Sequence, residues 1–180
     1  MDWKALYHSS RNIFEPSTLP SWISRESAAR TRGISVAGVV TVRRSGDLLE
    51  LDMRAANLTQ AHEPNLCKAL GLPDSPVWVA DGCNDAAIVE LADEAAVRAV
   101  APDLAALKQI PRMAVITARG DNHDIASRVF VPYLGIDEDP VTGSAHAALA
   151  PFWTERLGRN SFTALQASDL GDKPRLIRID

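Results

Sequence analysis

A ten-residue stretch stands out in this sequence: Asp137-Glu138-Asp139-Pro140-Val141-Thr142-Gly143-Ser144-Ala145-His146. Its three acidic residues and proline are expected to end an incoming strand, and Gly-Ser then opens a helix that we predict from Ala145 to about Leu157. A turn of small residues at a helix start presents backbone N–H groups, with the positive end of the helix dipole behind them. Glycine lets an anion approach closely, and the serine hydroxyl adds a donor. The stretch therefore predicts a binding site for a carboxylate or a phosphate.

Size and composition are those of a globular protein. The chain has 180 residues, of which 46% are hydrophobic and 23% charged, and its formal net charge is −4. That charge, without a dense run of Lys and Arg, argues against a nucleic-acid partner. No apolar run approaches the length of a membrane span, and the N-terminus lacks the layout of a secretory signal. Cys67 and Cys83 form no CxxC pair, so neither a disulfide framework nor a zinc site is indicated. We expect a cytoplasmic protein.

The sequence pattern divides the chain into three segments. In residues 1–33, aromatic side chains occur among Ser, Arg and Pro with neither the helical nor the strand period. This N-terminal segment matches no recognisable sequence pattern. In the segment 34–60, the stretches Ile34 to Val42 and Leu48 to Met53 flank a Ser-Gly turn and predict a β-hairpin. The segment 61–180 holds the remaining elements and the ten-residue stretch.

Strands and short helices follow one another in the third segment. Strands are predicted at 77–80, 86–91, 113–118, 127–133, 162–166 and 176–179. Helices are predicted between Pro64 and Pro76, from a cap at Asp93 to Val100, from Pro102-Asp103 onward, and from Ala145 to a stop at Gly158. Strands outnumber helices and mostly neighbour each other in sequence, which is typical of an α+β fold.

Further motifs on either side of the ten-residue stretch carry a resemblance to a known family. They are Ser127-Arg128-Val129-Phe130, Gly135-Ile136, Leu149-Ala150-Pro151-Phe152-Trp153, Leu157-Gly158 and the Q-x-S element Gln166-Ala167-Ser168. With Glu138 to His146 they resemble the second-domain signature of the phenazine-biosynthesis PhzF-like family, which belongs with the diaminopimelate-epimerase-like proteins. The resemblance implies an α+β fold of two similar domains, each a curved sheet wrapped round a central helix, with only part of the first domain present in this chain. The hairpin of the segment 34–60 would be a remnant of that first domain, and 61–180 would be the second.

The resemblance also implies an activity. Members of the family are isomerases or epimerases that remove and return a proton on a small carboxylated metabolite without a cofactor, so a biosynthetic role is expected. By position in the signature, the resemblance implies Asp139 and Ser144 as catalytic residues and Gly143, Ser144 and Ala145 as substrate-binding residues. Independently of the resemblance, the charge, the apolar runs and the lack of a His/Cys ligand pattern predict no nucleic acid, no membrane and no metal among the partners. Because an incomplete first domain would leave apolar surface open, we also expect a homodimer or self-association through that face.

The sequence departs from the family pattern in its first part. Family members carry a proton-shuttling glutamate and a later Gly-His element in the first domain, and residues 1–33 contain neither motif. The chain therefore looks like the second half of an enzyme. A non-catalytic remnant that binds anions or a protein partner stays open as an alternative function.

Simpler interpretations exist for the same residues. Asp139 and Ser144 could serve only as caps of a turn and a helix, since both residue types are common caps. A hydrolytic triad of Asp139, Ser144 and His146 is disfavoured, because positions two apart on a helix point to opposite sides and no G-x-S-x-G elbow is present. We expect His146 to be a buried helix histidine and Arg128 to be a structural ion-pair partner.

Overall fold

The structure of the chain is a computed structural model, which describes residues 9–14, 30–35, 38–45, 48–81, 85–168 and 175–180. Side chains are described at residues 51, 53–81, 85–168 and 176–180. The strands are β1 (Ser9–Phe14), β2 (Arg30–Ser35), β3 (Gly38–Ser45), β4 (Leu48–Arg54), β5 (Leu58–Ala61), β6 (Val77–Ala80), β7 (Ala86–Glu90), β8 (Ala114–Arg119), β9 (Ile125–Phe130), β10 (Phe162–Gln166) and β11 (Arg175–Ile179). The helices are α1 (Pro64–Ala69), α2 (Glu94–Ala99), α3 (Leu104–Leu107) and α4 (Gly143–Leu157), with a 3₁₀ turn η3 (Pro132–Leu134).

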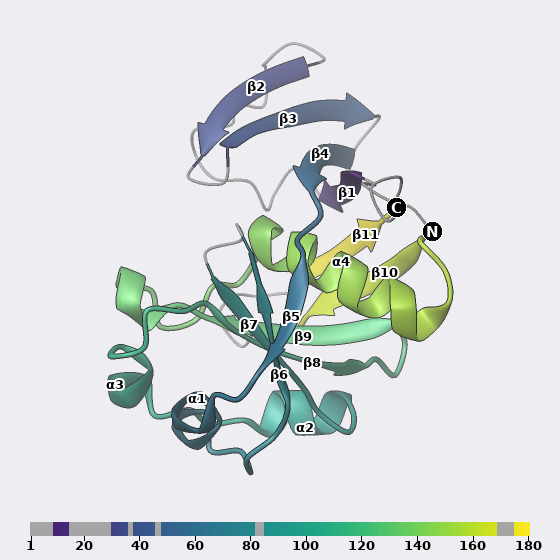
Figure 1. Cartoon of the computed structure of the whole chain (residues 1–180). Helices are drawn as coiled ribbons and strands as arrows, with labels where there is room; N and C mark the ends of the chain where they lie inside the picture. The colour runs from purple at the N-terminus through teal and green to yellow at the C-terminus, as the bar shows by residue number, and fades with distance from the viewer. Residues whose placement is uncertain (1–8, 15–29, 36–37, 46–47, 82–84, 169–174) are drawn as a thin grey trace.

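All the described strands belong to one sheet, in the order β2-β3-β4-β1-β11-β10-β9-β8-β7-β6-β5. Neighbouring strands are antiparallel, except that β7 pairs with β8 and β9 pairs with β10 in parallel. Figure 1 shows this sheet curving round α4. The helix contacts β1 and β4 in one part of the sheet and β5 and β7 in another, and these two pairs lie far apart in the strand order. The fold is α+β with a central helix, as the sequence predicts.

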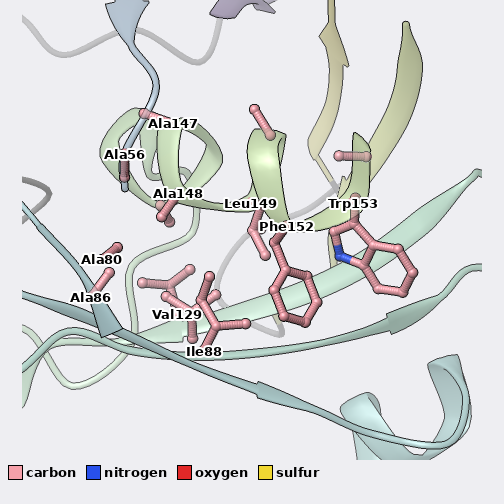
Figure 2. Packing of buried hydrophobic residues seen from close by; sticks show 14 of the residues in the cluster. Ala56, Ala80, Ala86, Ile88, Val129, Ala147, Ala148, Leu149, Phe152 and Trp153 are labelled. Carbon is pink, nitrogen blue, oxygen red and sulfur yellow. The ribbon is translucent and has the colours of Figure 1, made fainter. Parts of the chain in front are cut away.

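The central helix α4 is buried on almost every side. Ala145 to Ala150, Phe152 and Trp153 are all buried, and a helix that is apolar all round belongs in the interior of a fold. Figure 2 shows Leu149 and Phe152 directed toward Ile88 and Val129 of the sheet, while Ala147 lies close to Ala56 on another side of the helix. The backbone N–H of Ala56 donates to the carbonyl oxygen of Ala147 at 3.2 Å. The helix is therefore fixed in place by packing, and so is the position of its first residues.

The three short helices cover the other face of the sheet. Alternation along β8 separates the two sides, because successive side chains of a strand point to opposite faces. Met113 and Val115 pack with α4, whereas Ala114, Ile116 and Ala118 pack with a second buried cluster. That cluster takes in residues of all three short helices: Leu66, Cys67, Ala69, Val97 and Leu107.

Several predicted helix ends are confirmed. The Asp93 carboxylate accepts a hydrogen bond from the amide of Ala96 at 2.7 Å, and Asp103 does the same for Ala106 at 3.0 Å, so both aspartates are N-caps. Gly158 ends α4 in the left-handed conformation with φ 69°, which glycine adopts without steric cost. α4 begins two residues earlier than predicted, at Gly143 rather than Ala145.

The predicted hairpin of the segment 34–60 is confirmed as β3 and β4, but its first strand was placed wrongly. The stretch from Ile34 to Val42 contains the end of β2 and the start of β3, which pair with each other. Residues 9–14 and 30–33, where the pattern predicted no strand, lie in β1 and β2. β1 is held by ladders to β4 and β11 on its two sides, and such pairing overrides the local side-chain pattern.

The predicted strand 127–133 ends early, at Phe130. Pro132 has no backbone N–H and a fixed φ, so it ends the ladder and starts the turn η3, which Gly135 closes with φ 85°. The division of the chain into 1–33, 34–60 and 61–180 stays a prediction. β5 spans its second boundary, and one sheet runs through all three segments. No helix within the described residues combines the length and the apolar character needed to cross a bilayer.

Candidate functional site

The ten-residue stretch runs back along the end of β9. Val131 and Ile136 form an isolated bridge around η3, and the amide of Asp139 donates to the carbonyl oxygen of Val129 at 2.9 Å. The chain then enters α4 through Thr142, the N-cap residue. These contacts place the stretch beside the strand that carries Arg128.

A buried ion pair holds the acidic part of this stretch. Arg128 donates from Nε to Oε1 of Glu138 at 2.9 Å and from a terminal nitrogen to Oε2 at 2.8 Å, with both side chains almost fully buried. Its other terminal nitrogen donates to carbonyl oxygens at the end of α2, those of Val97, Arg98 and Val100. The prediction that Arg128 is an ion-pair partner is confirmed. The bidentate geometry fixes Glu138 as well as neutralising it.

The side chain of Gln166 clamps the turn between Asp139 and Thr142. Its Oε1 accepts from the backbone N–H of Thr142 at 2.9 Å, and its Nε2 donates to the carbonyl oxygen of Asp139 at 2.6 Å and to the Thr142 hydroxyl at 3.2 Å. Gln166 lies at the end of β10 and is fully buried. The turn is thereby fixed to the sheet by a side chain distant in sequence.

The start of α4 has no side-chain cap from its N-cap residue. Thr142 occupies the N-cap position but makes no side-chain capping bond. Within the described part of the chain, no acceptor takes the amide hydrogens of Ser144 or Ala145. Ser144 is half-buried, whereas the Ala145 side chain is in the core, so a ligand would reach Ala145 only through its backbone. These two N–H groups at the end of a 15-residue helix suit a carboxylate.

The remaining predicted site residues lie on the same turn or at its end. Gly143 is the first residue of α4 and is half-buried. Asp139 accepts a hydrogen bond at Oδ1 from the amide of Val141 at 3.2 Å, so this carboxylate does cap a turn. The interpretation of Ser144 as a helix cap is wrong, because Thr142 holds that position.

His146 is confirmed as a buried helix histidine. Its Nδ1 lies 2.8 Å from the carbonyl oxygen of Thr142, which requires the Nδ1–H tautomer as donor. Burial lowers the pKa of His146 from 6.5 to about 4, although the bond to Thr142 opposes the shift. Nε2 has no partner within the described residues. The side chain is engaged with Thr142, so it does not form the triad with Asp139 and Ser144.

Other features of the described residues do not add to this site. No group of three or more His, Cys, Asp or Glu side chains there could hold a metal ion. A cavity of about 460 Å³ lies elsewhere, lined by Glu63, Asn65, Asp85, Gln109, Ile110, Pro111 and Arg112.

Sequence reasoning missed two parts of the arrangement. The Q-x-S element was noted as a motif, but the side chain of Gln166 was not predicted to bind the turn. Glu138 was not predicted as the partner of Arg128. A glutamine at the end of an apolar strand is a weak sequence signal for the first contact. The sequence of β9 contains no signal that Arg128 would pair with Glu138.

Comparisons with known proteins agree with this architecture. The family model for phenazine biosynthesis-like proteins matches residues 43–179. An uncharacterized isomerase of Pseudomonas aeruginosa is 45% identical over 148 residues, which cover 81% of this chain and 56% of that protein. A second uncharacterized isomerase of the same organism is 42% identical over 132 residues, covering 72% of this chain and 49% of that protein.

Solved structures give the same result. A phenazine biosynthesis PhzC/PhzF protein from Clostridium difficile has 29% sequence identity and a TM-score of 0.66, covering 88% of this chain and 64% of that one. A PhzF-family protein from Enterococcus faecalis has 28% identity and a TM-score of 0.64, covering 88% and 63%.

An α+β sheet wrapped round a helix whose start carries this signature defines a diaminopimelate-epimerase-like fold. Within that class, the chain belongs to the phenazine biosynthesis-like PhzF family, whose two relatives above are named isomerases. The chain spans about half the length of the curated relatives it matches.

Proposed function

We propose that this chain supplies the carboxylate-binding half of an isomerase site, where a proton moves on a small metabolite without a cofactor. The observation that carries the proposal is the pair of open amides, those of Ser144 and Ala145, in the first turn of α4. The amides of Ser144 and Ala145 lack a protein acceptor within the described residues, and they lie at the positive end of a helix that packing holds rigidly.

The chemistry follows from where charge develops. Removing a proton from the carbon next to a carboxylate pushes negative charge onto the carboxylate oxygens, and fixed N–H donors stabilise that charge as it grows. The Ser144 hydroxyl is a further donor. Asp139 uses Oδ1 for the turn, and its Oδ2 has no partner within the described residues, so that oxygen would accept a substrate N–H or relay a proton.

Substitution of the two proposed catalytic residues tests the roles. In D₂O, we expect the full chain to incorporate deuterium into one or more members of a panel of small amino and hydroxy acids. Ser144→Ala is expected to slow that exchange by about 10- to 100-fold, the value of a hydrogen bond to a charged group. Asp139→Asn is expected to slow it by a similar or larger factor. Mass spectrometry of the recovered acids measures the rate.

Two substitutions at exposed residues are matched controls. Ser161→Ala removes an exposed serine hydroxyl that binds Asp180, and Asp137→Asn neutralises an exposed carboxylate two residues from Asp139. Both should exchange at the rate of the unsubstituted chain. Unchanged exchange in Ser144→Ala and Asp139→Asn would refute the assigned roles.

A second candidate function is anion binding without turnover. It is favoured by the bond from the Val141 amide to Oδ1 of Asp139, which gives one oxygen of that carboxylate a structural task. Carboxylate binding at Ser144 without deuterium incorporation into any acid of the panel would favour this candidate. Clear incorporation would eliminate it.

A further inference from the structure

The N-cap residue of α4 behaves unlike most threonines in that position. An N-cap hydroxyl commonly accepts a hydrogen bond from the amide of the second or third helical residue. In α4 those residues are Ser144 and Ala145, the two whose amides lack an acceptor within the described residues. The Thr142 hydroxyl instead accepts from Nε2 of Gln166 at 3.2 Å.

Gln166 is itself held so that it cannot release this hydroxyl easily. Both ends of its amide are engaged, Oε1 by the Thr142 amide and Nε2 by the Asp139 carbonyl oxygen. Its backbone lies between two ladder partners, Ser127 of β9 and Arg175 of β11. A fully buried amide that rotated would leave polar groups unsatisfied, which is costly in an apolar interior.

We propose that Gln166 is a positioning residue that keeps the carboxylate site open by withholding the Thr142 hydroxyl from the helix start. The proposal rests on the proposed function, because it concerns the same two amides. Gln166 need not touch a substrate. It acts through Thr142, by denying the amides of Ser144 and Ala145 an internal acceptor.

Loss of Gln166 has a defined consequence. The Thr142 hydroxyl would turn about one side-chain bond toward the helix start and accept from one of the two amides. An internal acceptor is always present at high effective concentration, so it would compete with any carboxylate from solution. The site would close without any change in the residues proposed to bind the ligand.

Carboxylate titration of the full chain tests this directly. Succinate is added to ¹⁵N-labelled protein, and the amide shifts of Ser144 and Ala145 report binding. Gln166→Met, which keeps the side-chain length but removes both polar groups, is expected to weaken succinate binding about tenfold, equivalent to about 1.4 kcal/mol. Before any succinate is added, one of these two amides should already be shifted, because it donates to the Thr142 hydroxyl.

A second substitution separates this mechanism from simple destabilisation. In the Gln166→Met background, Thr142→Val removes the competing hydroxyl and should restore most of the lost affinity. By itself, Thr142→Val should bind succinate no more weakly than the unsubstituted chain, because Nε2 of Gln166 keeps its bond to Asp139. This single substitution is nearly isosteric, so it tests the proposal even if Gln166→Met does not fold.

Thr163→Val is the matched control on the same strand. It removes a hydroxyl that binds Asp124, so it should lower stability and leave succinate affinity unchanged. Equal affinity in Gln166→Met and the unsubstituted chain would overturn the proposal and leave the proposed function standing. Weaker binding by Thr142→Val alone would also overturn it. Absence of any shift at Ser144 and Ala145 in the unsubstituted chain would overturn both.

Discussion

Replacing Arg128 with methionine is expected to lower the free energy of unfolding by about 3–5 kcal/mol, because it leaves the Glu138 carboxylate buried without its partner. Both side chains are almost fully buried, and the pair is bidentate at 2.8 and 2.9 Å. The substitution also removes donors from three carbonyl oxygens at the end of α2, which would then be less well satisfied. Urea unfolding of the full chain, followed by circular dichroism, measures the loss.

A double substitution shows how much of that loss in unfolding free energy comes from the buried, unpaired Glu138 carboxylate. Arg128→Met combined with Glu138→Leu removes both charges and should be more stable than Arg128→Met alone. Recovery should be partial, since the α2 carbonyl oxygens still lack donors. As a control, Arg178→Met breaks the exposed pair with Asp180 and should cost less than about 1 kcal/mol. A double variant no more stable than the single one would contradict this account.

The helix ends show which parts of this fold are predictable from sequence. Asp93 caps α2 through an amide three residues away, and Gly158 ends α4 by its own φ. Both effects are local, because the residues that determine each helix end lie within a few positions of one another in the sequence. α4 was likewise predictable as a helix. Its burial on almost every side could not be predicted in this way, because it depends on strands that are distant from α4 in the sequence.

The clamp on the turn shows what sequence cannot give. Thr142 and Gln166 are 24 residues apart, and they meet only because β10 runs parallel to β9, so that Gln166 lies opposite Ser127. Arg128 and Glu138 are only ten residues apart, yet their contact depends on η3 turning the chain back. β1 was missed for the same reason, because its strand conformation is imposed by β4 and β11. Contacts between segments distant along the chain or turned back on themselves therefore decided these three misses, whereas the early end of the predicted strand 127–133 is a local effect of Pro132.

Three polar groups of Thr142 are engaged by the side chains of Gln166 and His146. Gln166 takes the amide and the hydroxyl, and His146 takes the carbonyl oxygen through Nδ1. The N-cap residue is therefore fixed from both sides by buried side chains. Burial strongly disfavours the charged form of His146, although the bond from Nδ1 to the Thr142 carbonyl oxygen opposes this effect. The helix start should consequently depend on pH.

Acid is expected to destabilise the folded chain through His146. Its folded pKa is about 4, against 6.5 in the unfolded chain, so the unfolded chain binds more protons between these values. Stability therefore falls as pH falls below about 6.5, by about 2 kcal/mol at pH 5 and about 3 kcal/mol at pH 4. Below about pH 4 the folded chain also takes up the proton, and this contribution stops growing. Urea unfolding at a series of pH values from about 7.5 to 4 measures the trend.

Comparison with His146→Asn isolates the histidine from the carboxylates that also titrate in acid. Asparagine can keep a donor to the Thr142 carbonyl oxygen but does not ionise, and it should be less stable than the unsubstituted chain at pH 7.5 because it leaves a cavity. The carboxylates are common to both chains, so their contributions cancel in the difference. That difference should shrink by about 3 kcal/mol on going to pH 4. Leu149→Ala, a buried change one turn further along α4, should show a loss that does not vary with pH. A His146→Asn difference as constant as that of Leu149→Ala would mean that His146 does not stay neutral in the folded chain.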